Sequence, residues 1–223
     1  MVFRGRFLAG PDERARVVLA TRNPGKINEV RRILEPLGLT LLGLDAFPDA
    51  SEVEESGASF LENALLKARA AARETGLPAL ADDSGLAVDA LDGAPGVRSA
   101  RYGGEPRSDA CNNEALLAAL EDVADERRGA AFVCVAAAAL PAGDAIWEEG
   151  QWRGRVLRSP RGEGGFGYDP LFLDPGTDRT AAELLPAEKD ARSHRGHAFG
   201  KLAPRLAAFV RGSAAKQGDA APG

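Results

Sequence analysis

Apolar and polar residues alternate along this chain in short blocks, and the spacing within them changes between that of strands and that of helices. The apolar run 17–20 predicts a short buried strand. Apolar positions within residues 27–37 then repeat at helical spacing, Gly38 follows as a stop signal, and residues 39–44 predict the next strand. This order of strand, helix and strand is the start of an α/β pattern.

A second helix is predicted to begin at Phe60. Ser59 is a suitable N-cap, and Glu62 stands three positions further on, so the two residues form a capping-box sequence. The helix is expected to end near Gly76.

The second half of the chain adds strands that are joined by a short turn. The remaining predicted elements are a helix from Ser108 or Asp109 to about Val123, a hairpin of strands 131–140 and 146–156, and a last helix from about His197 to Val210 disturbed by Pro204. A hairpin among alternating helices and strands indicates an α/β fold with a mixed sheet. We expect residues 1–15 to be a flexible extension, residues 16–211 to be a single domain, and residues 212–223 to be a flexible tail.

Composition excludes several classes of protein. The 223 residues are 44% hydrophobic and 27% charged, as in an ordinary globular protein, and the net charge of -5 argues against a general nucleic-acid binder. Residues 1–16 lack an apolar core segment, and the longest apolar run, 130–140, is too short to span a membrane. Cys111 and Cys134 lack the spacing of metal ligands, so reduced thiols and a cytoplasmic location are expected.

The most informative stretch is the loop at residues 161–170, with four glycines in six positions. Glycines remove the side chains that would keep a ligand away from the backbone, while Phe166 and Tyr168 supply flat faces and Asp169 supplies an acceptor. The match to a dinucleotide fingerprint is weak, because this loop follows a hairpin rather than an early strand.

A polar loop at residues 21–26, directly after the first predicted strand, is the second candidate. Such a loop can place backbone N–H groups and the start of a helix around an anion, with Lys26 as a point charge. It lacks the spacing of a Walker loop, and an ordinary capped turn between strand and helix is the favoured explanation when this loop is considered alone. Together, the two loops suggest a nucleotide held in a cleft.

Two acidic pairs form the third candidate, Glu54 with Glu55 and Asp82 with Asp83. The second pair lies between two predicted strand segments, 79–81 and 86–91, so we expect it at the carboxyl end of a strand, where α/β ligand sites gather. One acid from each pair, with phosphate oxygens of a substrate, would suit Mg²⁺. The alternative is that both pairs lie in solvated turns.

Cationic side chains form the last candidates. Lys189, His194 and Arg195 fall within seven positions and could read a base edge or a phosphate, although charged residues at the start of a helix explain them as well. Lys67, on the helix after Glu62, could equally face solvent.

Taken together, these residues resemble the inosine/xanthosine triphosphate pyrophosphatases, a family of HAM1/RdgB-like enzymes. The resemblance covers about residues 17–211. Its motifs are Thr21-x-Asn23-x-x-Lys26, Glu55-Ser56-Gly57, Phe60-x-Glu62-Asn63-Ala64, Ala81-Asp82-Asp83-Ser84-Gly85-Leu86, Gly93-Ala94-Pro95-Gly96, Ser99-Ala100-Arg101-Tyr102, Gly164-Gly165-Phe166-Gly167-Tyr168-Asp169-Pro170 and Ser193-His194-Arg195. No single motif is decisive, but the set is specific.

The resemblance implies a role for each candidate residue. It implies an elongated mixed sheet flanked by helices, two lobes with the active-site cleft between them, and a homodimer. Asp83 would accept a proton and bind Mg²⁺ together with Glu55 or Glu54. The substrate-binding residues it implies are Thr21, Arg22, Asn23, Pro24, Gly25, Lys26, Lys67 and Ser84 for the triphosphate, and Phe166, Gly167, Tyr168, Asp169, Lys189, His194 and Arg195 for the base.

The activity implied is Mg²⁺-dependent hydrolysis of noncanonical purine nucleoside triphosphates (ITP, dITP and XTP) to monophosphate and pyrophosphate. Neither a nucleic acid nor a membrane is an expected partner. Two other readings stay open: a related pyrophosphatase that prefers pyrimidine or modified nucleotides, and a nucleotide-binding module without catalysis.

Overall fold

A single mixed sheet organises the chain in a computed structural model that describes residues 15–50, 53 and 55–218. The strands are β1 Arg16–Leu19, β2 Thr40–Gly43, β3 Ala79–Val88, β4 Gly129–Ala139, β5 Ala145–Val156, β6 Phe172–Asp174 and β7 Arg179–Thr180. Their order is β2-β1-β3-β4-β5-β6-β7; β1 runs parallel to β2 and β3, and the later neighbours are antiparallel. The expected mixed α/β sheet is therefore confirmed.

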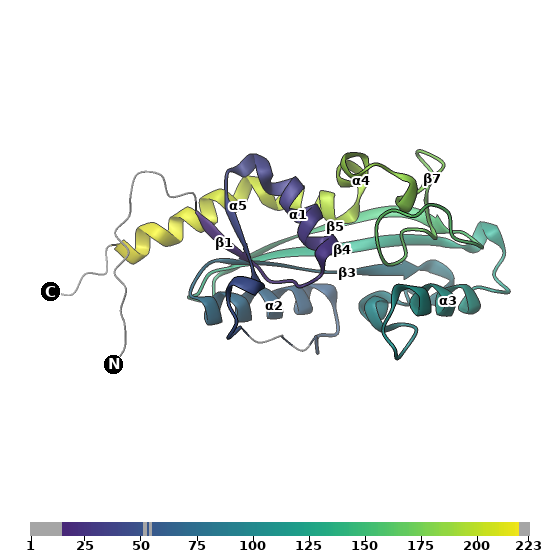
Figure 1. Ribbon diagram of the computed structural model, residues 1–223, viewed down its shortest axis with the longest axis horizontal. Helices are drawn as coiled ribbons and strands as arrows, with labels where there is room; N and C mark the ends of the chain where they lie inside the picture. The colour runs from purple at the N-terminus through teal and green to yellow at the C-terminus, as the bar shows by residue number, and fades with distance from the viewer. Residues whose placement is uncertain (1–14, 51–52, 54, 219–223) are drawn as a thin grey trace.

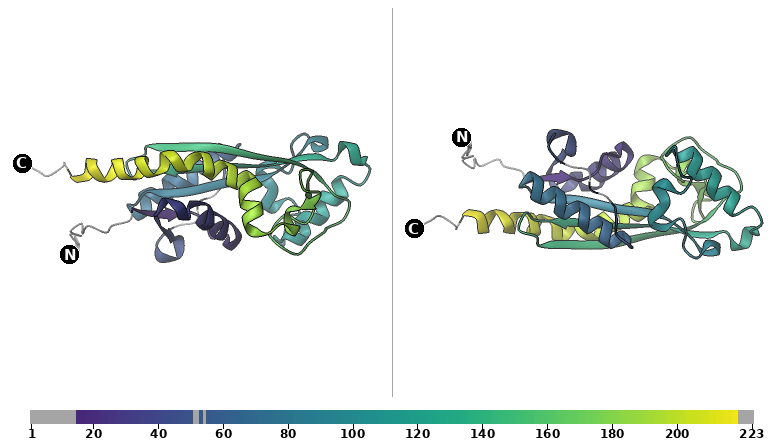
Figure 2. Two further views of the ribbon diagram at one scale, coloured as in Figure 1. Left: turned by 90° about the horizontal axis from the view of Figure 1, so that it is seen from above. Right: turned by 90° about the horizontal axis from the view of Figure 1, so that it is seen from below.

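Helices cover both faces of this sheet. They are α1 Pro24–Leu34, α2 Phe60–Thr75, α3 Asp109–Ala119, α4 Pro186–Arg192 and α5 His194–Gly218. Figure 1 shows an elongated molecule in which α1, α4 and α5 lie on one side of the long strands while α2 and α3 lie on the other, and the views of Figure 2 agree. No helix within the described residues is long and apolar enough to cross a membrane.

Several helix ends follow from local chemistry. The Ser59 hydroxyl accepts the Glu62 N–H at 3.2 Å, as expected for an N-cap, but the Glu62 carboxylate accepts the Ala58 N–H rather than that of Ser59. Gly76, with φ +69°, ends α2 in the left-handed conformation.

Two of the predicted helices have different boundaries in the structure. Helix α3 stops at Ala119 rather than near Val123. The last helix starts at His194, not near His197, and runs unbroken through Pro204 to Gly218 instead of ending at Val210.

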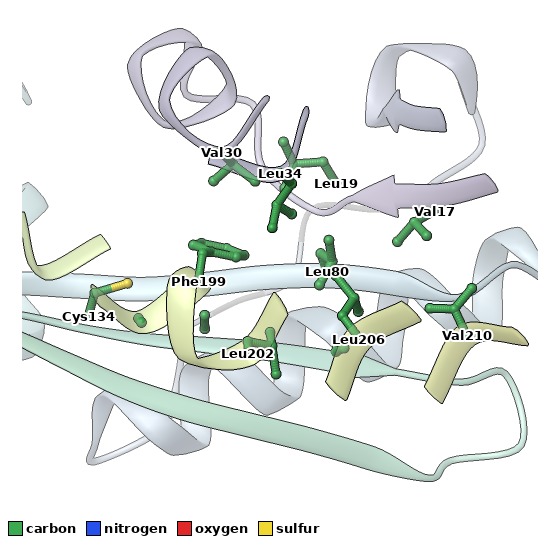
Figure 3. Close-up of a cluster of buried hydrophobic side chains, with 13 residues drawn as sticks. Val17, Leu19, Val30, Leu34, Leu80, Cys134, Phe199, Leu202, Leu206 and Val210 are labelled. Carbon is green, nitrogen blue, oxygen red and sulfur yellow. The ribbon is translucent and has the colours of Figure 1, made fainter. Parts of the chain in front are cut away.

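The core lies in layers between the sheet and the helices. Apolar side chains of β1, α1, β3 and α5 pack together on one face, including Val17, Leu34, Leu80, Phe199 and Leu206 (Figure 3). The alanine-rich α2 packs on the opposite face. Small side chains let α2 lie close to the sheet, which places its polar side chains near β3.

Candidate functional site

The first candidate loop is both a capped turn and part of a cavity wall. The side chain of Asn23, the N-cap of α1, accepts the Lys26 N–H at 3.1 Å, and Pro24 occupies the first helical position, where no N–H is needed. The ordinary structural explanation thus holds. However, the side chains of Thr21, Arg22, Asn23 and Lys26 also line a cavity of about 720 Å³.

Two adjoining cavities make up the site. We call the one of about 720 Å³ the wide cavity and a second one, of about 140 Å³, the narrow cavity. Both are lined by Asn23, Lys26, Glu55 and Ala100, so they meet there. The wide cavity is further lined by Ala20, Thr21, Arg22, Leu44, Val53, Lys67, Ala71, Arg101 and Arg107. The narrow cavity is further lined by Asp83, Ser84, Gly85, Val97, Ser99, Asp109, Asn112, Phe132, Phe166, Gly167, Tyr168, Asp169, Lys189, His194 and Arg195.

The prediction that Asp82 and Asp83 follow the end of a strand is wrong. Both lie inside β3, which is one strand and pairs with β4 along its whole length. Their charges are tolerated in a buried strand because cationic side chains reach them, a compensation that the local sequence does not reveal. Strand β1 pairs with β3 only at Ala79 and Leu80, so the acids lie just beyond the point where β1 ends.

At the wall of the wide cavity, Lys67 joins the two predicted metal ligands. Its Nζ atom donates to Glu55 Oε1 at 2.7 Å and to Asp83 Oδ1 at 3.1 Å. The Asn63 amide donates to Asp83 Oδ2 at 3.1 Å. Lys67 therefore faces the site and not solvent, and sequence analysis missed Asn63 as a functional contact, although it stands in the quoted motif.

These contacts shift the protonation of the three groups in different directions. Burial raises the pKa of Asp83, and Lys67 and Lys26 only partly offset this effect. Burial alone would raise the pKa of Glu55 too, but Lys67 holds that pKa below its usual value. Burial would lower the pKa of Lys67, yet Asp83, Asp82 and Glu55 raise it, so Lys67 stays a cation.

The donor set at this place suits a hard divalent cation. The oxygens of Glu55 and Asp83 converge on one positive centre, the Lys67 ammonium. Mg²⁺ is commonly held by one or two carboxylates plus substrate phosphates, not by an all-protein cage. The described residues contain no cluster of three or more His, Cys, Asp or Glu side chains placed to hold a metal ion. Glu54, the alternative ligand, lies outside the described residues.

A buried chain of alternating charges runs behind the narrow cavity. It links Lys26, Asp82, Arg195, Glu29, Lys189 and Asp169 in that order. Lys26 Nζ lies 3.0 Å from Asp82 Oδ2, which also accepts from Arg195 at 3.0 Å. Glu29 accepts from Arg195 at 2.6 Å and from Lys189 at 2.8 Å. We refer to these six residues as the ion chain.

Glu29 is the member of the ion chain that sequence analysis missed altogether. It lies three positions after Lys26 on α1, a spacing that puts both residues on the same side of the helix. That spacing was the one available signal, because its partners stand 160 and 166 positions away.

Within the ion chain, partner charges decide the state of most groups. Burial would raise the pKa of Asp82, but Lys26, Arg195 and Lys67 hold it well below its usual value. The pKa of Glu29 is likewise lowered by Arg195 and Lys189 against the effect of burial. At Asp169 burial outweighs the partner charge, so its pKa is raised despite the contact with Lys189.

The glycine-rich loop closes the narrow cavity with its aromatic residues. The Phe166 ring lies 4.8 Å from Lys189 Nζ and 5.7 Å from the Arg195 guanidinium, both measured to the ring centre. A Cβ atom on Gly25 would stand 2.4 Å from this ring, so the two candidate loops touch only because residue 25 is glycine. Asp169 accepts the Phe166 N–H at 2.8 Å and is thus the expected fixed acceptor.

Two further predicted base-side residues are held by the protein itself. The buried Tyr168 hydroxyl donates to the Ser99 carbonyl at 2.8 Å. The His194 ring stacks on Phe132 with ring centres 4.7 Å apart, and burial, aided by Arg195 and Lys189, lowers the pKa of His194 well below its usual value. Ser84, expected beside the triphosphate, lines the narrow cavity and bonds Asp82 and Arg195.

The structure thus brings distant parts of the chain to one place. Asp83, Lys26 and Phe166, from β3, α1 and the glycine-rich loop, all line the narrow cavity. Pro24 and Gly25 contribute through the backbone turn and through contact with Phe166. A wide cavity rich in cations that opens into a narrow aromatic one defines an α/β protein of the class that binds polyanionic ligands with a flat ring.

Comparisons with known proteins identify the family. Residues 17–205 match the Ham1 family. The dITP/XTP pyrophosphatase of Nocardia farcinica is 56% identical over 199 residues, covering 88% of this chain and 97% of the relative. That of Frankia alni is 60% identical over 196 residues, covering 86% and 96%. The chain belongs to the Ham1 family.

Solved structures agree with the fold. A HAM1 protein from Coxiella burnetii matches with a TM-score of 0.79 at 45% identity, covering 86% of this chain and 98% of that one. The dITP/XTP pyrophosphatase of Mycobacterium abscessus matches with a TM-score of 0.69 at 52% identity, covering 86% and 99%.

Proposed function

We propose that this chain hydrolyses dITP, ITP and XTP to the nucleoside monophosphate and pyrophosphate, and so removes noncanonical purines from the nucleotide pool. Family membership, with relatives of 56% and 60% identity named dITP/XTP pyrophosphatases, supports the activity. The observation that carries it is the position of Asp83, which lines the narrow cavity and bonds Lys67 of the wide one.

The nucleotide would lie across the junction of the two cavities, in a cleft between two lobes. Its triphosphate occupies the wide cavity, where Thr21, Arg22, Asn23, Lys26 and Lys67 supply donors. Its base enters the narrow cavity against Phe166. The width of the first cavity suits a flexible chain of phosphates, while the second admits one flat ring.

The reaction is attack by water on the α-phosphorus. A new P–O bond forms to the water oxygen, the bond from the α-phosphorus to the α–β bridging oxygen breaks, and pyrophosphate leaves with that oxygen. Asp83 accepts the proton released by the attacking water. Lys26 and Lys67 offset the charge that builds on the phosphate oxygens.

Glu55 and Asp83 would hold Mg²⁺ together with phosphate oxygens of the substrate, and Glu54 is a further candidate ligand. When bound, the ion supplies positive charge that neutralises the triphosphate and orients it. Lys67, which these carboxylates bind in the structure, would then donate to phosphate instead.

Preference for inosine and xanthosine over adenosine follows from donors that face the base. Glu29 and Asp169 use two of the three Lys189 N–H groups, so one remains for a 6-keto oxygen, next to Arg195 and His194. Adenine presents an amino group there and would leave the donor unpaired. An unpaired buried donor costs roughly 1–3 kcal/mol, or about tenfold or more in selectivity.

We further place the enzyme in the cytoplasm as a homodimer. The buried thiol of Cys134 and the half-buried thiol of Cys111, both unpaired, are consistent with a reducing compartment. The dimer rests on the family resemblance alone.

A nucleotide panel tests the proposal. Pyrophosphate release is measured from dITP, XTP, dGTP, dATP and dCTP, each with Mg²⁺ and with chelator. Release from dITP and XTP that chelator abolishes is the expected result. Preference for dCTP or a modified base would point to the related pyrophosphatase instead, and binding without release in every arm would point to a noncatalytic module.

A further inference from the structure

Helix α3 holds the glycine-rich loop at a single residue, Gly167. The Gly167 N–H donates to Asp109 Oδ2 at 2.6 Å, and the Gly167 carbonyl accepts from Asn113 Nδ2 at 2.9 Å. Gly167 has φ +61°, a left-handed conformation that other residues rarely adopt. Both polar backbone groups of Gly167 are therefore bonded within the protein.

The two residues that bind the Gly167 backbone are suited to act together. Asp109 and Asn113 are four positions apart on α3, so their side chains lie on the same face of the helix. Asp109 is exposed at the rim of the narrow cavity, whereas Asn113 is half-buried. One supplies an acceptor and the other a donor, so the two peptide groups on either side of the Gly167 Cα atom are both fixed.

Helix α3 is itself fixed at both ends, so it can serve as a rigid support. At its start, Ser108 accepts the Cys111 N–H at 3.1 Å, and Asn112 accepts the Gly103 N–H at 2.8 Å. Just past its end, the buried Arg128 donates to the Leu120 carbonyl at 2.7 Å. A helix held in this way can keep the groups that its side chains bind in a fixed place.

Gly167 stands between the two aromatic residues of the loop. The Phe166 ring lies near Lys189 and Arg195, and Asp169 binds Lys189. Movement of the Gly167 backbone would therefore shift both the Phe166 ring and the Asp169 carboxylate. Since Lys189 is a proposed base reader, a small rotation at Gly167 would misplace the donor and the ring together.

We infer that Asp109 and Asn113 are positioning residues that set base selectivity by holding the backbone of Gly167. The inference rests on the proposed function and deepens it. Neither residue needs to touch the nucleotide. They act through the loop, so their loss should affect discrimination between bases more than the chemical step at the phosphates.

Four variants separate positioning from simple loss of structure. Asn113→Asp keeps the size of the side chain but removes its donor, and Asp109→Ala removes the acceptor. Asp109→Asn keeps an acceptor oxygen and is the conservative rescue. Glu114→Gln changes one charge at an exposed neighbour on the same helix and is the matched control. For each variant, kcat and KM are measured with dITP and dATP, together with Tm.

Asn113→Asp should lower the dITP-to-dATP ratio of kcat/KM about tenfold, as expected for one lost donor, with kcat on dITP within about threefold of wild type. Asp109→Ala should lower the ratio less, because Asp109 is exposed. Asp109→Asn and Glu114→Gln should keep the wild-type ratio. An unchanged ratio in Asn113→Asp and Asp109→Ala would overturn the inference, as would equal losses in Asp109→Ala and Asp109→Asn.

Calorimetry of ITP and ATP binding in chelator measures base selectivity without turnover. If wild type binds ITP selectively but releases no pyrophosphate, the proposed function fails, and the binding ratio of Asn113→Asp still decides the inference. If wild type is active and Asn113→Asp keeps its binding and kinetic selectivity, the inference fails and the function stands.

Discussion

The narrow cavity and the wide cavity share Asn23, Lys26, Glu55 and Ala100, yet they differ in how firmly their charges are held. Behind the narrow cavity, Arg195 is 1% exposed and is bonded to Asp82 and Glu29. At the wide cavity, Arg101 is 37% exposed and its closest carboxylate oxygen, on Glu55, is 3.8 Å away. Buried and closely paired cations lie behind the narrow cavity, whereas the wide cavity also has more exposed arginines.

This difference matches what each part of a nucleotide requires. A flat base is recognised by donors at fixed positions, and a buried ion chain provides them because its members cannot relax independently. A triphosphate is flexible and strongly anionic. In the ion chain and its Lys67 neighbourhood, the four cations Lys26, Lys67, Lys189 and Arg195 face five carboxylates, so the positive charge that a polyanion needs must come from elsewhere. In the proposed reaction, the arginines that line the wide cavity and Mg²⁺ would supply it.

The largest effect is expected for a substitution of Asp83, near the junction of the two cavities. Asp83→Asn removes the proposed proton acceptor and should lower kcat by roughly 10²–10⁴-fold, the usual contribution of a general base. Its Tm should not fall, because burial raises the pKa of Asp83 and the ionised form is unfavourable in the folded state. Pyrophosphate release and thermal unfolding measure the two quantities. Asp89→Asn, at an exposed ion pair with Arg153, is the control, and near-normal turnover in Asp83→Asn would reject the assignment.

Next in size is the loss of a charge from the ion chain. Arg195→Ala leaves Asp82 and Glu29 with fewer cationic partners in a buried place, which typically costs about 3–5 kcal/mol of folding free energy. Urea unfolding at pH 7 measures it. Arg153→Ala breaks an exposed pair with Asp89 and should cost about 1 kcal/mol or less. Equal losses of folding free energy in the two variants would contradict the contrast between buried and exposed charges.

Much of the fold could be predicted because the decisive signals are local. The apolar run 17–20 contains most of β1, and Ser59 begins α2 as its sequence predicts. The start of α5 was placed three residues late, because His194 and Arg195 look like exposed polar residues before a helix. In the structure both are buried within its first turn.

The motifs predicted that several candidate residues would lie close together, but not which ion pairs would join them. The motifs brought Asp83, Lys67 and Phe166 to one place, and the structure agrees. They could not reveal that Asp82 lies within a strand or that Glu29 joins Lys189 to Arg195, because those contacts connect residues more than 50 positions apart. A charged residue is predicted to be exposed to solvent as long as its distant partner is unknown.

At the exposed arginines of the wide cavity, a smaller effect on substrate binding is expected. Arg101→Ala should raise KM for dITP by about fivefold, corresponding to roughly 1 kcal/mol for a partly exposed charge, and leave kcat nearly unchanged. The effect should shrink at high salt, because the side chain is accessible to solvent. Steady-state kinetics at two ionic strengths measure it. Arg98→Ala, an exposed residue of the same 3₁₀ helix (Gly96–Arg101), is the control, and a matching rise in its KM would show that net charge alone is responsible.

The smallest effect concerns His194, which lines the narrow cavity as a neutral ring. Its pKa is lowered well below the usual value, so below about pH 6.5 the unfolded chain binds a proton that the folded protein refuses. Stability is then lost as the pH falls through that range, by about 0.8 kcal/mol between pH 7.5 and 6.0. His194→Gln should lose correspondingly less over this interval in urea unfolding, whereas the exposed His197→Gln should behave as wild type. If His194→Gln keeps the full pH dependence, the ring titrates in the folded protein, and the narrow cavity is less closed to water than its buried charges imply.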